Sequence, residues 1–384
     1  MQNRHMGHRL GAALSIALLV IGCGGSEEDT AATGGGSSVG GGSSVGGASS
    51  GGNAGSATGG SAGAGASSGA GSGGLSGSGG LSSGSVTVTG SGFGTKPMPG
   101  PVLFDDFESG SVGGKTENQP AVVGKWQSGA GSDAPIYSDE VVRVGVRASK
   151  HPFTKSVYNA SLSLNLDFSV AYLDYWTYVK PLDALPNGFS RNWKPFRIYG
   201  NNDALQTGTT TLNGNDSAIA YFIDSNNSIS LTEWLGGYPS GWFHIQYWVR
   251  LNDVGAANGS FWLRINNSLD GQSGVTLRGG SAELDQLRIG HYWATDGVPG
   301  WTHENSGANV YVDDVYFDTT WARVELGDAA DYAATTHREI QLVQTWSDTA
   351  VTFVPRRGTL PAGPAWAFVI GANGKVLATH ALTP

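Results

Sequence analysis

A predicted strand over residues 242–251 carries polar and aromatic side chains on one face and apolar side chains on the other. Successive side chains of a strand point to opposite faces, which separates the two sets. The polar and aromatic set comprises Trp242, His244, Gln246, Trp248 and Arg250. Indole rings stack on the C–H face of a sugar, while amide and guanidinium groups donate to its hydroxyl groups and to any carboxylate. This mixture indicates carbohydrate recognition.

The next predicted strand, residues 260–266, repeats the pattern, with Trp262 and Arg264 opposite an apolar face. Two strands joined by a short loop place such faces side by side on one sheet surface. We therefore predict a ligand-binding surface made of Trp242, Trp248, Trp262 and Arg264. The alternative is that the indoles fill a layer under loops or under the C-terminal part of the chain, because tryptophan is often largely buried.

A second cluster, residues 190–199, reads SRNWKPFRIY and is locally basic. Alternation places Arg197 and Tyr199 on one face, away from Phe196 and Ile198.

The rest of the folded part is acidic. The net charge of −9 belongs to residues 99–384, because the three basic and three acidic residues before them cancel. An acidic domain has no long-range attraction for polyanions, so nucleic-acid binding is not expected.

The N-terminal 23 residues have the pattern of an export signal, with a basic start and an apolar stretch over residues 12–19. Val20-Ile21-Gly22-Cys23 resembles the bacterial lipobox, in which the cysteine becomes lipid-modified. Cys23 is the only cysteine, which fits a lipid acceptor and excludes intramolecular disulfides. We predict lipidation at Cys23 and an exported protein at the outer membrane or cell surface, held to the membrane by the lipid alone. The alternative is a plain secretory signal.

Residues 24–98 are rich in glycine and serine and almost free of large side chains. Such a segment buries too little surface to offset the entropy of ordering, so we predict a disordered linker.

Period-two patterns recur from residue 101 onward. The clearest predicted strands span residues 169–180, 194–199, 218–223, 242–251, 260–266, 287–293 and 309–318. We predict an all-β fold, a two-sheet antiparallel jelly-roll sandwich over residues 99–320.

After residue 320 shorter strands follow, and Asn373-Gly374 is a hairpin signal. We predict a small immunoglobulin-like β-sandwich module over residues 321–384, packed against the jelly roll because so short a segment makes a small core.

At VLFDDFESG, GWFHIQYWVRLN, GSFWLRINN and NVYVDDVYFDT the chain resembles the concanavalin A-like lectin/glucanase superfamily, and most of all its polysaccharide-lyase-like jelly rolls. The resemblance covers about residues 101–320. Resembling lyases neutralise a uronate carboxylate with Arg, Asn or Gln and move protons with His or Tyr. If the chain is an enzyme, the resemblance therefore implies a lyase in which Arg197 or Gln246 neutralises, His244 is the base and Tyr199 the acid.

Two family motifs are absent, the E-x-D-x-E strand of laminarinase-type glycosidases and the Y-F-K-A-G motif of alginate-lyase relatives. Retaining hydrolysis, which needs two close carboxyls, is thus disfavoured.

Three functions stay open: polysaccharide binding by a monomeric surface lipoprotein, β-elimination of a uronate-containing glycan, and a structural or adhesive role towards another protein. No organic cofactor is expected.

The acids of FDDFES (residues 104–109) and VDDVYFD (residues 312–318) lie far apart in sequence. In resembling jelly rolls the first and last strands are adjacent, which would bring these carboxylates together. Hard oxygen ligands of this kind suit Ca²⁺. We predict a structural calcium held by Asp106 or Glu108 with Asp314. Solvated or backbone-bonded acids are the alternative.

Overall fold

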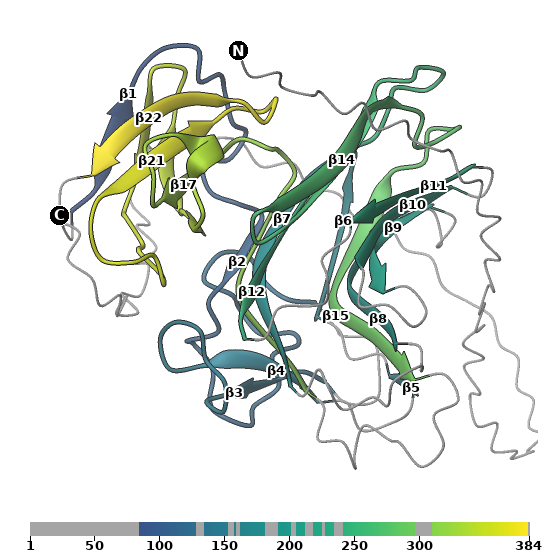
Figure 1. The fold of residues 1–384 in the computed structure, drawn as a ribbon. Helices are drawn as coiled ribbons and strands as arrows, with labels where there is room; N and C mark the ends of the chain where they lie inside the picture. Colours follow the sequence, from purple (N-terminus) through teal and green to yellow (C-terminus); the bar gives the residue numbers. More distant parts are fainter. Residues whose placement is uncertain are drawn as a thin grey trace, which may run out of the picture. The chain divides into compact units, whose positions relative to one another are not determined.

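The computed structural model describes residues 84–127, 134–152, 157–158, 162–180, 191–200, 205–211, 218–224, 227–233, 241–295 and 309–382 (Figure 1). The predicted signal, Cys23 and residues 24–83 of the predicted linker lie outside these ranges. In the described part, regular structure is almost wholly antiparallel strand, with one short 3-10 helix, η1 (Tyr332–Ala334). Within that part no helix has the length and apolarity needed to cross a membrane.

The first sheet of the sandwich is named here the β12 sheet. Its strands run in the order β14 (Ser268–Val275), β13 (Gly259–Ile265), β12 (Phe243–Arg250), β7 (Val170–Lys180), β16 (Asn309–Asp318), β4 (Ala148–Pro152) and β3 (Ile136–Ser138), and β2 (Leu103–Asp105) also pairs with β16. The pairing of β2 with β16 confirms that the first and last strands of the jelly roll are adjacent.

The second sheet is named the β8 sheet and faces the first (Figure 1). Its strands are β11 (Asn227–Glu233), β10 (Ala218–Asp224), β9 (Leu205–Thr211), β8 (Arg191–Gly200), β15 (Leu284–Thr295) and β5 (Val157–Tyr158), with β6 (Leu162–Phe168) paired to β15. All seven strands predicted from period-two patterns are present, with ends shifted by a few residues. The predicted two-sheet antiparallel sandwich is therefore confirmed.

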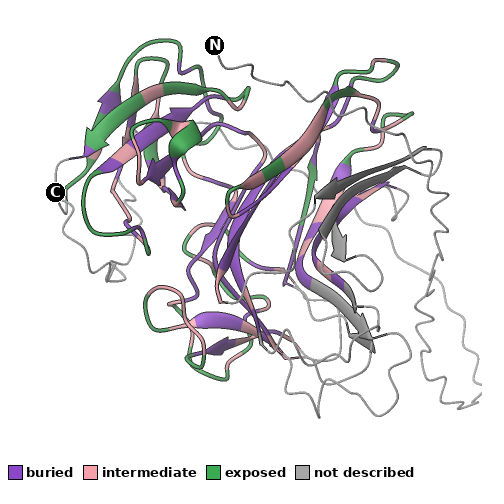
Figure 2. Cartoon of the chain, viewed as in Figure 1, coloured by how far each residue is buried: buried purple, intermediate pink, exposed green. Residues whose placement is uncertain are grey.

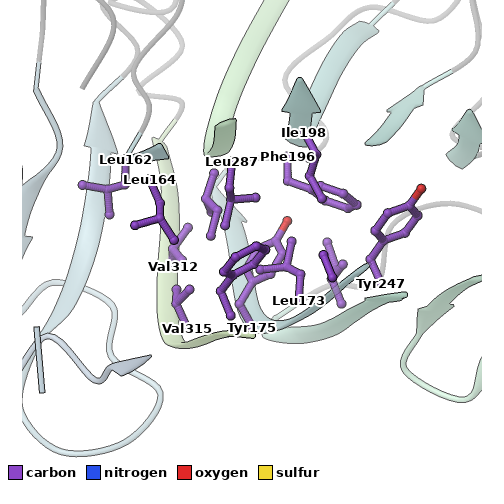
Figure 3. Packing of buried hydrophobic residues seen from close by; sticks show 14 of the residues in the cluster. Leu162, Leu164, Leu173, Tyr175, Phe196, Ile198, Tyr247, Leu287, Val312 and Val315 are labelled. Carbon is purple, nitrogen blue, oxygen red and sulfur yellow. The ribbon is translucent and has the colours of Figure 1, made fainter. Parts of the chain in front are cut away.

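The core lies between the two sheets and is built by alternation (Figure 3). Leu173 and Tyr175 of β7 and Tyr247 of β12 point inward from one sheet, and Phe196 and Ile198 of β8 from the other. All five are fully buried. Residues that alternate with them must therefore point outward, away from the opposite sheet.

The C-terminal module consists of two small sheets around a core of its own. One has the order β18 (Arg338–Ile340), β17 (Arg323–Gly327), β21 (Ala365–Ile370) and β22 (Val376–Leu382), and the other β1 (Val86–Thr89), β20 (Ala350–Phe353) and β19 (Val343–Trp346). Strand β22 forms an edge and is mostly exposed (Figure 2).

Strand β1 lies within the segment predicted to be linker up to residue 98. It pairs with β20, so the module recruits a strand from before the jelly roll. The segment reads VTVT, and Val88 is buried in the module core. A four-residue strand after a long run of glycine and serine gives little local signal, because its pairing partner lies far away in sequence. The predicted hairpin at Asn373-Gly374 is present, with Gly374 at a φ of 77°.

Candidate functional site

The four predicted lyase residues lie on two different sheets. Arg197 and Tyr199 belong to β8, and His244 and Gln246 to β12. In both strands the intervening residues fill the core between the sheets, so each pair points outward from its own sheet. The two pairs therefore lie on opposite outer faces of the sandwich and do not meet in one site. Sequence reasoning joined them because alternation gives the face of a strand but not the sheet to which it belongs.

The outer face of the β12 sheet is covered by the C-terminal module. Trp248 is 6% exposed and packs in a cluster with Trp321 and Ile340 of the module. Trp262 is half-buried against the same cluster. The alternative left open from the sequence was that the indoles fill a layer under the C-terminal part. This is the case for Trp248, and in part for Trp262, which packs against the same cluster. Trp242, just before β12, is half-buried like Trp262, but it is not part of that cluster.

A polar network fixes the module to this face. The Gln246 amide donates to Asp174 (2.8 Å) and to the hydroxyl of Tyr172 (2.7 Å), and it accepts from Arg264 (3.0 Å). Arg264 also donates to the Tyr332 hydroxyl of the module, at 3.1 Å. Gln246 is fully buried and Arg264 is 8% exposed. Gln246 also donates to Glu325 of the module, at 3.2 Å. Both residues therefore link the jelly roll to the module.

His244 is also buried, at 3% exposed. Its Nε2 lies 2.7 Å from an Asp174 carboxylate oxygen, and its ring stacks on Trp176 with centroids 4.5 Å apart. A carboxylate at one ring nitrogen fixes the orientation of an imidazole. His244 lines a cavity between this sheet and the module.

The two acid-rich segments meet, and arginines neutralise them. A bulge in β16 places Asp313 and Asp314 together on the outer face, between the inward-pointing Val312 and Val315. Asp314 forms ion pairs with Arg143 and with Arg356, the latter at 3.1 Å. Burial and the neighbouring Asp314 charge raise the pKa of Asp313 well above its ordinary value.

The residues predicted to hold calcium are in contact with arginines and with backbone N–H groups. Asp106 lies 3.5 Å from Arg356, which it shares with Asp314, while Glu108 accepts from the backbone N–H groups of Val146 and Arg147. Ca²⁺ requires about six to eight oxygen ligands. Among the described residues, no group of three or more His, Cys, Asp or Glu side chains is arranged to hold a metal. The predicted calcium would have to displace guanidinium groups.

The outer face of the β8 sheet gathers a different set of groups. The register aligns Tyr199 with Gln286 of β15 and with Gln206 of β9, and Arg197 with Arg288 of β15. Arg197 donates to the Tyr199 hydroxyl at 2.8 Å, and the Arg288 guanidinium lies 4.9 Å from the centre of the Tyr199 ring. We call these five residues the β8 face.

Hydrogen bonds extend the β8 face towards β6. Arg288 donates to the Gln286 amide oxygen at 2.5 Å, and Gln286 donates to Asn165 at 2.7 Å. Tyr199 is 5% exposed, whereas both arginines are half-exposed. The face thus presents two cations and several amides beside one tyrosine hydroxyl.

Sequence reasoning found Arg197 and Tyr199 but missed Arg288, Gln286 and Gln206. The signal for two of these was present, because Leu287 and Ile289 are apolar and alternate with Gln286 and Arg288. Assigning them to the same face as Tyr199 needs the pairing of β15 with β8, which joins residues almost ninety positions apart.

No protein-family model matches the chain, and no curated protein gives a match. Solved structures with a related arrangement include the endo-β-1,4-glucuronan lyase of the fungus Trichoderma reesei, with a TM-score of 0.38 and 16% identity over 58% of this chain and 97% of that one. An alginate lyase Aly36B mutant in complex with alginate tetrasaccharide has a TM-score of 0.40 and 11% identity, over 57% of this chain and 97% of that one. The binding domain of botulinum neurotoxin serotype G has a TM-score of 0.36 and 13% identity, over 70% and 72%. Similarities this low leave the chemistry of this chain open.

Proposed function

We propose that the protein binds an acidic polysaccharide on the β8 face. The observation that supports this most is the pairing of Arg197 with Arg288 across two strands, beside Tyr199, in a domain of net negative charge. Guanidinium groups bind carboxylates through charge-assisted, often bidentate hydrogen bonds. Two such groups on a sheet face suit a chain that carries regularly spaced carboxylates.

The location of the β8 face also favours this role over the surface predicted first. The C-terminal module contacts the outer face of the other sheet, where Trp248, Gln246 and Arg264 are occupied by structural contacts. On the β8 face both arginines are half-exposed. The binding residues proposed here are therefore Arg197, Arg288, Gln286 and Gln206, around Tyr199.

Affinity electrophoresis tests this proposal. The protein is run through gels containing alginate, glucuronan, pectate, ulvan or a glycosaminoglycan, with a neutral glucan as the control. We expect retardation by at least one acidic polymer, and we expect Arg288→Ala to weaken it about tenfold or more, since a charge-assisted hydrogen bond is lost. The matched control Arg147→Ala removes the same charge from a loop. Equal retardation of both variants would overturn the proposal.

A second candidate function, cleavage by β-elimination, is favoured by the hydrogen bond between Arg197 and Tyr199. It places a hydroxyl able to transfer a proton beside a cation able to neutralise a uronate carboxylate, as this reaction requires. Because His244 lies on the other sheet, Tyr199 would have to serve both as the base that takes the C5 proton of the uronate and as the acid that protonates the leaving oxygen. A rise in ultraviolet absorbance from unsaturated uronates, lost in Tyr199→Phe, would support cleavage. No rise with any of the five polymers would leave binding alone.

We extend the proposal to location, with Cys23 lipid-modified and the folded part held away from an outer membrane by the linker. This part rests on the lipobox-like VIGC and the single cysteine. Mass spectrometry of the membrane fraction should find an acylated peptide beginning at Cys23. An unmodified Cys23 peptide from secreted protein would contradict it.

A further inference from the structure

A cavity of about 410 Å³ lies between the outer face of the β12 sheet, the loop that carries Arg143, and the C-terminal module. Its volume is within the range of sites for small ligands. The residues that decide its chemistry are Trp242, His244, Asn266, Asn267, His337 and Arg338. The cavity is separate from the β8 face, which belongs to the opposite sheet.

Of the two indoles in the cavity wall, only Trp242 has ring surface to offer. The Trp176 ring stacks on the His244 ring, and its centre lies 3.8 Å from the Arg143 guanidinium carbon. The His337 ring also stacks on Trp176, with the ring centres 5.4 Å apart. Trp242 is half-exposed, and its ring is tilted by 59° to that of Tyr178. A half-exposed indole at the edge of a cavity is a platform for the C–H face of a sugar.

Arg338 is the unusual group of the cavity. It is 6% exposed and donates to the Asn267 amide oxygen at 3.2 Å and to the backbone oxygen of Tyr332 at 3.0 Å. Its Nε is buried and makes no hydrogen bond within the described part of the chain. Of the two arginines in the cavity wall, Arg143 forms ion pairs with Asp314 and Glu339, whereas no described carboxylate forms an ion pair with Arg338.

The Arg338 charge contributes to the lowered pKa of the buried Glu325, but no carboxylate contacts Arg338 directly. A buried cation without a direct carboxylate partner is costly, and a ligand carboxylate would relieve that cost. The neighbouring turn adds polar groups. Asn266, at a φ of 51°, accepts from the His244 backbone N–H through its amide oxygen at 2.9 Å. Asn267 is exposed beside it. The amide nitrogens of this turn can donate to hydroxyl groups.

We infer that this cavity binds a single acidic sugar unit, free or at the end of a chain. Arg338 pairs with the carboxylate, Trp242 stacks on the ring, and Asn266 and Asn267 donate to hydroxyl groups. The cavity, at about 410 Å³, has room for one unit, whereas the β8 face is a surface suited to a continuous chain. The inference does not depend on the function proposed for the β8 face.

Saturation-transfer NMR with two matched probes tests the inference. Methyl β-D-glucuronide should receive magnetisation from the protein and methyl β-D-glucoside should not, because only the first has a carboxylate for Arg338. Trp242→Ala and Asn267→Ala should each weaken glucuronide binding about tenfold, as lost stacking or polar contacts predict. Trp366→Ala, a half-exposed tryptophan of the module outside the cavity wall, is the matched control and should bind as the wild type does.

Arg338→Gln should abolish glucuronide binding, with its melting temperature measured in parallel. If that variant does not fold, Trp242→Ala and Asn267→Ala decide the matter. Absence of glucuronide binding by the wild type would overturn the inference. So would binding that survives in both cavity variants, or binding that Arg288→Ala alone removes, since the ligand would then lie on the β8 face.

Discussion

At the scale of single residues, two buried carboxylates, Glu325 and Glu339, hold the module interface through arginines. Burial alone would raise the pKa of Glu325, but the charges of Arg323 and Arg264 outweigh it and lower the pKa to about 2. Glu339 shows the same balance, with Arg143 and His337 lowering its pKa to about 2. Both groups therefore stay ionised in the folded protein well below the pH at which they gain a proton in the unfolded chain.

This difference predicts acid-sensitive stability. A carboxylate with a lowered folded pKa stabilises the fold fully above its unfolded pKa, near 4.5, and that stabilisation disappears as pH falls towards 2. At pH 7 Glu325→Gln should cost about 3 kcal/mol, because Arg323 is left buried without its partner. Urea unfolding between pH 7 and pH 2.5 should show this difference shrinking below pH 4.5. A difference that does not change with pH would contradict the assignment.

At the same scale, the arginines of the acid cluster predict an outcome for metal removal. Because Arg143 and Arg356 already neutralise Asp314, we expect EDTA to leave the melting temperature unchanged. Arg356→Met should lower it, since Asp106 and Asp314 would lose their shared cation. Differential scanning fluorimetry measures both. A fall of several degrees with EDTA, restored by calcium, would instead support the calcium predicted from the sequence.

At the scale of elements, alternation correctly predicted which residues share a face in β8 and in β12. Trp248 and Gln246 do lie together on β12, as Arg197 and Tyr199 do on β8. What alternation does not contain is the partner of each face. Residues 321–340 cover the β12 face, and β15 completes the β8 face. Both arrangements depend on contacts between segments that are distant in the sequence. Local patterns carry no information on such contacts.

The bulge in β16 illustrates the same limit in one element. Strict alternation would place Asp313 and Asp314 on opposite faces, yet both lie on the outer face because the register with β7 shifts there. Asp314 has a φ of 50°, a conformation that aspartate tolerates better than most residues. Asp314→Val should therefore destabilise the protein by about 2 kcal/mol or more, from backbone strain and from the unpaired arginines. Stability equal to the wild type in urea unfolding would count against this.

At the scale of the whole folded part, the jelly roll and the module share buried contacts. Trp321 donates to the backbone oxygen of Ala171 at 3.0 Å, and Tyr172 donates to Glu325 at 3.1 Å. We expect both parts to unfold together in one calorimetric transition. Trp321→Ala should lower that transition, because it removes a buried indole from the contact at a cost of about 3 kcal/mol. Two transitions, one unaffected by the substitution, would show that the module is independent.

The central claim is that an acidic polysaccharide binds on the β8 face, and arginine-specific labelling tests it most directly. The protein is treated with phenylglyoxal in the presence and absence of each acidic polymer, and the modified peptides are quantified by mass spectrometry. We predict that a bound polymer protects Arg197 and Arg288, both half-exposed, and leaves Arg147 unchanged. Binding without protection of Arg197 and Arg288 would contradict the claim.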